Sequence, residues 1–186
     1  MPRLTPITTR EQVEAGGEEA FDRVIGSRGR VNAPASMLMY VPEVSAISTA
    51  MSDAVRFGAK TLIEGDVELA ILCTGREFDI PYIWGQHVEL AVTKGVDRAV
   101  IDAIGNLQPI PSTSTRHTLI PRLAHAVIRE HHVPDELFEA VRAEFGERGL
   151  MEIVSVFGHV MTSGCALITT DYHPEPGAPI LPPRNA

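Results

Sequence analysis

The side chains best suited to acid–base chemistry in this chain are a carboxylate and an imidazole within residues 67–96. Glu68 lies in one expected helix and His87 lies in the next. Ile80, Ile83 and His87 recur at steps of three and four residues, which places them on one face of a helix. An imidazole that is oriented by a carboxylate on an adjacent helix can act as a general base or acid. The alternative is a buried Glu–His pair that only ties the two helices together.

Three side chains close to this pair in the sequence are candidates for contacts with a substrate. Tyr82 offers a phenol that can bind a substrate oxygen. Trp84 is either part of an apolar pocket wall or an aromatic residue at a helix packing seam. Arg76 follows Glu68 by about two helical turns and can bind a carboxylate with two hydrogen bonds. The alternative for Arg76 is an ion pair with an acidic residue or with a neighbouring subunit.

His159 is a second imidazole, in an expected helix over residues 150–169 that is apolar on almost every side. A helix of that kind lies at the centre of a fold or at a subunit interface. His159 is then either a hydrogen-bonded core residue or a second titratable group of the site. Glu68, His87 and His159 are of residue types that bind zinc or iron, but nothing besides the residue types supports a metal site. We therefore expect no metal.

Sequence motifs that would signal a cofactor or a catalytic metal are missing. Neither GxGxxG nor GxxxxGK[ST] occurs, and there is no HExxH and no paired CxxC. The glycine- and arginine-rich residues 26–32 do not stand between a strand and a helix, which is the context that binds phosphate. We expect these residues to form a loop that closes a pocket or takes part in assembly, and we expect no cofactor.

The elements that position these side chains are predicted to be helices, since no alternation of polar and apolar residues extends beyond four positions. Asp79 is the expected N-cap of the helix that carries His87, and Pro81 suits its first turn. We expect a single all-α domain over residues 1–186, with an extended arm at 1–10 and a proline-rich tail at 173–186. The predicted helices cover residues 12–25, 42–57, 64–78, 79–93, 97–104, 119–131, 135–145 and 150–169.

Length, composition and charge limit the class of protein. The chain has 186 residues, of which 44% are hydrophobic, and this suits one domain with a sizeable core. A formal net charge of −8 without basic runs argues against binding to nucleic acid. Cys73 and Cys165 are expected to be buried free thiols. Neither a signal peptide nor an apolar run of about 20 residues is found, so we expect a cytoplasmic protein without a membrane span.

Four segments resemble the carboxymuconolactone decarboxylase family, which includes the alkylhydroperoxidase D (AhpD) proteins. RVNAPASMLMYVPEV is similar to the N-terminal loop of the family, and ELAILCTGREF is similar to its first motif helix. YIWGQHVELAVTKGV is similar to the second motif helix of cysteine-free members, and ERGLMEIVSVFGHVM to the closing helix. The resemblance spans residues 31–168 and implies an AhpD-like helical domain.

Departures from the family pattern concern the centre of the site. In redox-active members two cysteines occupy the positions of Ile80 and Ile83, so the resemblance implies no thiol peroxidase chemistry here. Ile83 also replaces a glutamate that is common in cysteine-free members. Tyr40 stands where histidine is frequent, and His159 stands where tyrosine is frequent. The resemblance therefore adds Tyr40 and His159 to the candidate residues and makes Ile80 and Ile83 part of an apolar wall.

The predicted function is a cofactor-independent lyase or isomerase that acts on a small oxygenated organic acid or lactone. Its predicted catalytic residues are His87, which moves the proton, Glu68 and Tyr82. The predicted substrate-binding residues are Arg76, Ile80, Ile83, Trp84, His159 and Tyr40. A non-catalytic ligand-binding or assembly protein is the alternative, while a hydroperoxide reductase would lack its CxxC motif. Related proteins form trimers and hexamers, so we also expect a homo-oligomer, with the tail along a neighbouring subunit.

Overall fold

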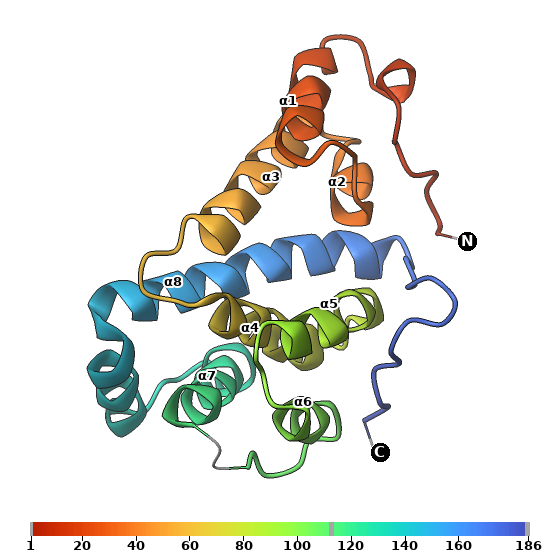
Figure 1. The fold of residues 1–186 in the computed structure, drawn as a ribbon. Helices are drawn as coiled ribbons and strands as arrows, with labels where there is room; N and C mark the ends of the chain where they lie inside the picture. The colour runs from red at the N-terminus through yellow and green to blue at the C-terminus, as the bar shows by residue number, and fades with distance from the viewer. Residues whose placement is uncertain (1, 112–113, 185–186) are drawn as a thin grey trace.

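Every regular element in the described part of the chain, residues 2–111 and 114–184, is a helix in the computed structural model (Figure 1). The predicted all-α class is therefore confirmed. The elements are η1 (Arg10–Gln12), α1 (Glu18–Arg28), α2 (Ala33–Leu38), α3 (Pro42–Phe57), α4 (Glu64–Glu77), α5 (Pro81–Thr93), α6 (Arg98–Gly105), α7 (Thr115–His125), the π-helical turn η2 (Ala126–Glu130) and α8 (Asp135–Thr169).

The centre of the fold is α4, which packs against α5, α7 and α8. Every residue of α4 from Gly65 to Glu77 is buried, and these residues include the charged side chains of Glu68 and Arg76. A buried charge is costly unless it is paired and hydrogen-bonded. The central place of α4 therefore requires that Glu68 and Arg76 each find partners inside the protein.

A second long element, α8, runs beneath the N-terminal helices and is divided by Gly146. The φ angle of Gly146 is 68°, a left-handed conformation that favours glycine, and the two predicted helices meet at this residue. By length and composition alone α8 could cross a membrane. One of its faces nevertheless lies in the main apolar core through Ile153, Phe157 and Leu167, as in the central helix of a compact protein.

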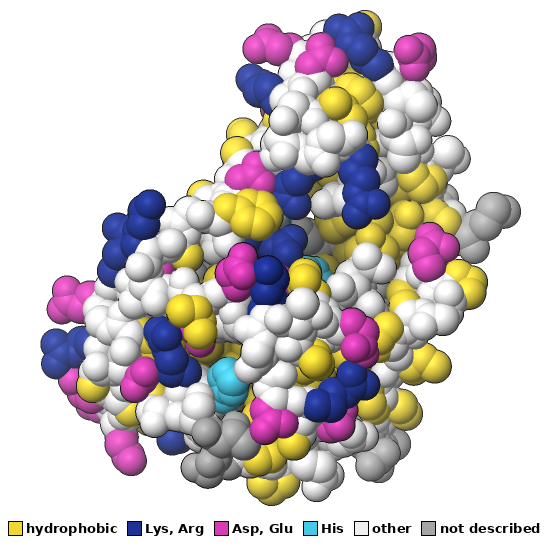
Figure 2. Space-filling view, in the orientation of Figure 1, with side chains coloured by type: hydrophobic (Ala, Val, Ile, Leu, Met, Phe, Trp, Pro, Cys, Tyr) yellow, Lys and Arg dark blue, Asp and Glu magenta, His cyan; other side chains and the backbone are white. Residues whose placement is uncertain are grey.

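The first three helices form a layer of their own above α8 (Figure 1). Their apolar cluster, which includes Phe21, Val24 and Met39, is separate from the main core around α4. Both α2 and α3 also pack against α8. Lys and Arg side chains gather where this layer meets the body of the protein (Figure 2). On the face that Figure 2 shows, part of the junction between the two layers is therefore lined by cationic side chains.

The boundaries of α1 differ from the helix predicted over residues 12–25. The helix begins only at Glu18, because Gly16 has a φ angle of 95° and breaks the earlier part. It ends at Arg28, and Gly29 caps it with a positive φ of 67°. The segment expected as a glycine- and arginine-rich loop therefore begins as the last turn of a helix.

Two other boundaries also depart from the prediction. The N-cap of α5 is Ile80, and Asp79 before it adopts a positive φ of 50° in the sharp turn between α4 and α5. The start of α7 is Thr115 rather than Leu119, since the side chain of Ser114 caps it. The structure agrees closely with the predictions for α3, α4 and α6.

The C-terminal tail is extended, as predicted, and it contacts the end of α4 in its own chain. Arg76 donates a hydrogen bond of 2.6 Å to the carbonyl oxygen of Pro182, and Arg184 binds the Asp79 carboxylate at 2.6 Å. The last two tail residues, 185 and 186, lie outside the described residues, as does residue 1 of the expected arm. The tail thus has a place on its own chain, and its contact with a neighbouring subunit stays a prediction.

Both cysteines are free, but they differ in exposure. Cys73 lies in α4 and is buried, whereas Cys165 lies on α8 and is exposed. The prediction of a buried thiol is therefore wrong for Cys165. The apolar residues of α8 surround the helix almost completely, and the sequence does not show which of its faces meets the core.

Candidate functional site

The predicted contact between the carboxylate and the imidazole is present in the structure. Nδ1 of His87 on α5 lies 2.6 Å from Oε2 of Glu68 on α4. The other carboxylate oxygen, Oε1, accepts a hydrogen bond of 2.8 Å from Nη2 of Arg56 on α3. Glu68 is 4% exposed, so both of its oxygens are held by side chains rather than by bulk water.

The electrostatics of this group favour an ionised Glu68. Burial by itself would raise the pKa of the Glu68 carboxyl, but the hydrogen bond and charge of His87 and the ion pair with Arg56 outweigh it and lower that pKa. A carboxylate can only accept hydrogen bonds, so Nδ1 of His87 must carry a hydrogen. Nε2 of a neutral His87 is then the nitrogen that is free to accept a proton.

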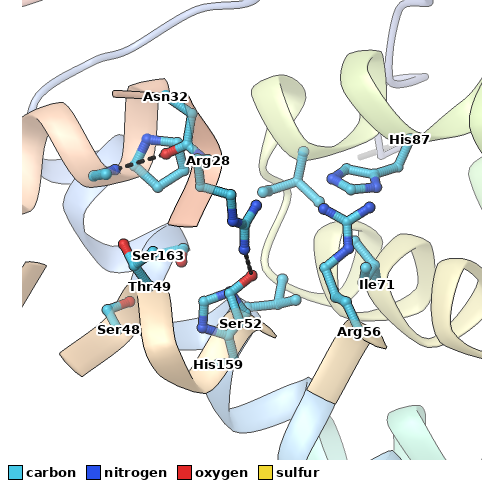
Figure 3. A pocket seen from close by; sticks show the side chains of 14 residues that line it. Arg28, Asn32, Ser48, Thr49, Ser52, Arg56, Ile71, His87, His159 and Ser163 are labelled. Carbon is cyan, nitrogen blue, oxygen red and sulfur yellow. Dashed lines mark hydrogen bonds between the residues drawn. The ribbon is translucent and has the colours of Figure 1, made fainter. Parts of the chain in front are cut away.

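His87 forms part of a small cavity of about 70 Å³ between the N-terminal layer and the body (Figure 3). Ile71 and Ile83 supply part of an apolar wall, and the remaining residues include hydroxyl and amide side chains, two arginines and two histidines. No carboxylate is among the described residues that line it. These residues are Arg28, Asn32, Pro34, Ala35, Ser48, Thr49, Ser52, Arg56, Ile71, Ile83, His87, His159, Val160 and Ser163.

Arg28 brings a second guanidinium to the cavity from the end of α1. Its Nε donates a hydrogen bond of 2.9 Å to Oδ1 of Asp53, and its Nη2 donates one of 2.7 Å to Oγ of Ser52. Ser27, beside it, also hydrogen-bonds to Asp53. The guanidinium is thus fixed against α3, and the helical conformation of residues 26–28 is what carries it there.

His159 on α8 lines the same cavity as His87, as the sequence analysis allowed. Its Nδ1 is buried and has no hydrogen-bond partner among the described residues. Burial, with Arg28 and Arg56 nearby, lowers the pKa of the His159 imidazole to about 4. His159 is therefore a neutral ring at pH 7, and its unpaired nitrogen is an unmet hydrogen-bonding group.

Arg56 and the hydroxyl side chains of α3 were not among the sequence candidates, and Arg28 was covered only as part of residues 26–32, which were expected to close a pocket or take part in assembly. A sequence signal for the polar side chains of α3 exists, because Thr49, Ser52 and Arg56 recur at steps of three and four residues. That spacing places them in one polar stripe on a helix that is otherwise partly apolar. The composition of residues 26–32 does not indicate which arginine lines the cavity, since the position of Arg28 depends on how α1 packs against α3.

Of the predicted wall residues, Ile83 lines the cavity, but Ile80 and Trp84 do not, and neither does Tyr82, which was predicted to be catalytic. Ile80 precedes the first turn of α5 with non-helical backbone angles, so it does not share the face of Ile83, and its side chain packs against Gly164 of α8. Tyr82 and Trp84 flank Ile83 on either side and point away from its face, because successive helical residues diverge by about 100°.

The contacts of the two aromatic residues confirm that they belong to packing regions. Tyr82 meets Tyr172 edge to face, with ring centroids 5.4 Å apart. Trp84 leaves no room for a Cβ at Gly105 on α6, where an added atom would lie 2.8 Å from its ring. Tyr82 is therefore placed outside the predicted catalytic group, and Trp84 has the packing role named as its alternative.

Tyr40 and Arg76 also lie away from this cavity. Tyr40 is 44% exposed, and its hydroxyl donates a hydrogen bond to the carbonyl oxygen of Thr5. Arg76 is placed at the far end of α4, because eight residues of helix separate it from Glu68 by about 12 Å along the axis. The ion-pair alternative for Arg76 is what the structure shows.

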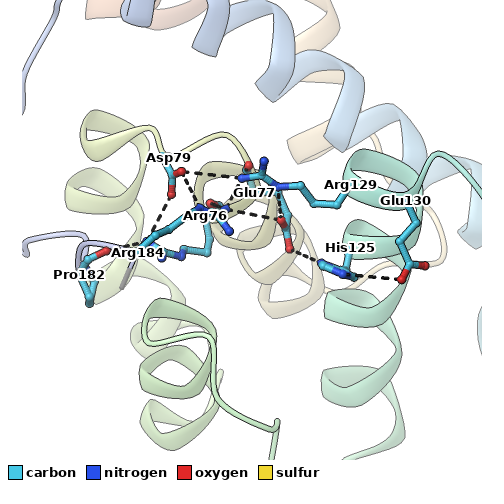
Figure 4. Close-up of polar contacts among 8 residues, drawn as sticks. All are labelled: Arg76, Glu77, Asp79, His125, Arg129, Glu130, Pro182 and Arg184. Carbon is cyan, nitrogen blue, oxygen red and sulfur yellow. Dashed lines mark hydrogen bonds and ion pairs between the residues drawn. The ribbon is translucent and has the colours of Figure 1, made fainter. Parts of the chain in front are cut away.

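Arg76 belongs to an ionic network at the end of α4 (Figure 4). Its Nη1 lies 3.4 Å from Asp79, which in turn binds Arg184. Glu77 accepts hydrogen bonds from Arg129 at 2.9 Å and from His125 at 3.0 Å. Arg76, Glu77 and His125 also line a larger cavity of about 560 Å³ that does not include His87. The network joins α4, α7, η2 and the tail.

A metal site does not emerge from the described residues. No three of their His, Cys, Asp and Glu side chains converge on one point. Glu68 and His87 meet directly, and His159 reaches the same cavity from the other side without joining them. The arrangement is that of an acid–base pair beside a cavity rich in hydrogen-bond donors.

Solved structures show which fold the chain has. One is described as the AhpD core of an uncharacterized peroxidase-related protein from Ralstonia eutropha JMP134, with a TM-score of 0.73, 17% identity and coverage of 94% of this chain and 93% of that one. Another is a cysteine-to-alanine variant of the debrominase Bmp8 in complex with 2,3,4-tribromopyrrole, with a TM-score of 0.72, 13% identity and 95% coverage of both chains. No family model and no curated protein matches the sequence. The chain therefore has the AhpD-like helical fold that its motifs predict.

Proposed function

We propose that this protein is a cofactor-independent enzyme that transfers a proton on a small oxygenated organic acid or lactone, as a lyase or an isomerase. The observation that carries the proposal is the Glu68–His87 contact of 2.6 Å beside a small, donor-rich cavity. The fold by itself does not decide the reaction, since one protein of this fold is described as peroxidase-related and another as a debrominase.

The proposed proton transfer uses the two nitrogens of His87 for different tasks. Nδ1–H donates to Glu68, which fixes the ring and stabilises the imidazolium that forms. Nε2 removes a proton from the substrate carbon next to a carbonyl group and later returns it to the product. The oxygen that becomes negative in between is stabilised by hydrogen-bond donors that line the cavity.

Thiol chemistry is not part of this proposal. Burial is the main cause that raises the pKa of the Cys73 thiol well above its ordinary value, so that the reactive thiolate is disfavoured. Cys73 lines the larger cavity, and neither Cys73 nor Cys165 lines the cavity of His87. Peroxide reduction by a thiolate and a resolving thiol has no matching pair of groups in the described residues.

The experiment that tests the proposal follows hydrogen exchange on candidate substrates. Small lactones and 2- and 3-oxo acids are incubated with the protein in D₂O, and the proton signals next to their carbonyl groups are followed by NMR. We expect the wild-type protein to accelerate deuterium incorporation into at least one compound. We expect His87→Gln to lose at least about a hundredfold of that rate, as is usual for a lost general base.

A matched control is His125→Gln, which changes a histidine that also contacts a glutamate but lies outside the cavity of His87. Its exchange rate should equal that of the wild-type protein. Equal rates in His87→Gln and wild type would rule out His87 as the base. Saturable binding of a compound without any exchange would favour the alternative, a non-catalytic ligand-binding protein on the same scaffold.

A further inference from the structure

The charged groups around the cavity of His87 are arranged with the cations facing inward. The guanidinium groups of Arg28 and Arg56 line the cavity, whereas their carboxylate partners do not. Asp53 lies behind Arg28 at 2.8 Å, and Glu68 lies behind Arg56 at 2.8 Å. A molecule inside the cavity would therefore meet hydrogen-bond donors first, which is the arrangement that selects an anion over a cation.

The same charges cancel in pairs, so a bound anion would have no net positive charge to balance it. Two guanidinium groups and two carboxylates sum to zero, so an anion would add an uncompensated negative charge to a partly buried site. Uncompensated buried charges are costly, and proteins commonly avoid them by a change of protonation. The cavity contains two imidazoles, His87 and His159, that could take up a proton.

His159 is the imidazole whose protonation would depend on the presence of the anion. His87 already has an anionic partner in Glu68, whereas Nδ1 of His159 is buried without any partner among the described residues. The groups that face His159 are Arg28 on α1, Asp53 and Arg56 on α3 and His87 on α5. An anion placed between the two guanidinium groups would offset their repulsion of a protonated His159 and would accept its second N–H.

The size of the cavity limits the anion. A volume of about 70 Å³ corresponds to roughly five water-sized positions, at about 15 Å³ for each. Formate, acetate and similarly short carboxylates fit that space. Hydroxyl groups of Thr49 and Ser52 and the amide of Asn32 can complete the hydrogen bonds of such an anion. Larger substrates would place only their carboxylate end here.

From these observations we propose that the cavity binds the carboxylate group of a small organic acid together with a proton, which His159 takes up from the solvent. This inference rests on the proposed function only in assigning the substrate to this cavity. It names the part of the substrate that is recognised there, a carboxylate, and the group that balances its charge. The proton comes from water or buffer, and no bond of the bound acid is broken.

Calorimetry with acetate tests the inference directly. Acetate is titrated into the wild-type protein at pH 7 in Bis-Tris and in triethanolamine, buffers with different ionisation enthalpies. The buffer dependence of the heat gives the number of protons taken up. We expect a net uptake of protons from the buffer with each acetate that binds. Acetamide, which has the same shape but no charge, should bind at least about tenfold more weakly and take up none.

Two further measurements assign the proton to a residue. In His159→Gln the uptake should disappear and acetate should bind at least about tenfold more weakly, whereas His125→Gln should behave like wild type. NMR of the wild-type histidine rings needs no variant and should show His159 becoming protonated at pH 7 when acetate is added. Uptake that persists in His159→Gln, or a His159 signal that does not change, would overturn the assignment.

The outcome separates this inference from the proposed function. Acetate binding without proton uptake, or no saturable binding up to about 100 mM acetate, overturns the inference while the hydrogen-exchange result stands. Proton-coupled binding without hydrogen exchange on any compound retains the inference and overturns the catalytic proposal. Each experiment has its own readout, because one measures protons bound at equilibrium and the other measures exchange at carbon.

Discussion

Glu68 holds two side chains in place, so its replacement should affect both stability and activity. In Glu68→Gln, the contacts with Arg56 and His87 lose the ionised acceptor, and a buried group without its partner costs about 1–3 kcal/mol. We expect the variant to fold, to be less stable by that amount in urea and to exchange substrate hydrogens more slowly. Glu64→Gln is the control, because Glu64 pairs with Lys94 while exposed and should change stability little.

His159 should make the stability of the protein fall as the pH falls. Its pKa is about 4 in the folded state and near 6.5 when unfolded, so between these values the unfolded chain binds more protons. The free energy of unfolding should therefore decrease by up to about 1.4 kcal/mol per pH unit on going from pH 6.5 toward pH 4. Urea titrations at several pH values would show this slope, and it should be smaller in His159→Gln. The same slope in both proteins would contradict it.

At the scale of elements, the close approach of α4 and α5 depends on Gly75. An added Cβ at this position would lie 2.9 Å from Cγ2 of Ile83, a residue of the cavity wall. We expect Gly75→Ala to destabilise the fold by about 1–3 kcal/mol, as overpacking does, and to lower activity by displacing Ile83. Thermal unfolding and the hydrogen-exchange rate measure the two effects.

Gly158 on α8 is the matched control for Gly75, since both are helical glycines. Nothing lies within 4 Å of a Cβ added at Gly158. Gly158→Ala should therefore be neutral or stabilising by up to about 1 kcal/mol, as expected from helix propensity. If both variants lose the same stability, the close packing of Ile83 is not the cause.

At the scale of the whole molecule, we expect no thiol-dependent turnover of alkyl hydroperoxides. Cys73 is buried in α4 and Cys165 is exposed on α8, so the two thiols lie in different environments and neither is in the cavity of His87. An assay of peroxide consumption with a dithiol reductant checks this. Robust consumption that is abolished by alkylation of the protein would show that the prediction is wrong.

We further propose that the protein assembles as a closed homo-oligomer, as a trimer or a hexamer. Exposed apolar side chains occur on α3 and on α8, and surfaces of that kind usually mark interfaces. Ile47 is 69% exposed and Met151 is 57% exposed. Light scattering at micromolar concentration should show the oligomer, and Ile47→Glu should weaken it without unfolding the chain. A wild-type monomer would contradict the proposal.

The tail should contribute to the fold of its own chain rather than only to assembly. Deletion of residues 174–186 removes the acceptor for Arg76 and one of the partners of Asp79, so a buried guanidinium loses its hydrogen bond. We expect a loss of about 1–3 kcal/mol in urea. If the deletion also dissociates the oligomer, the tail has a second role between subunits. Unchanged stability would contradict the role of the Pro182 contact.

The sequence by itself determined the helical class, most helix boundaries and the meeting of Glu68 with His87. These features are local, because helical periodicity and the short connection between α4 and α5 bring the two side chains together. The resemblance of the motif segments indicated the AhpD-like fold that the solved structures share.

Only the tertiary structure decided what surrounds that pair. Arg28, Arg56 and His159 come from α1, α3 and α8, and their approach depends on how these helices pack, which no local spacing encodes. Arg76 and Tyr82 lie outside the cavity, although both are close to Glu68 or His87 in the sequence. A helix turns a side chain to another face within one residue, so closeness along the chain does not place a residue in a site.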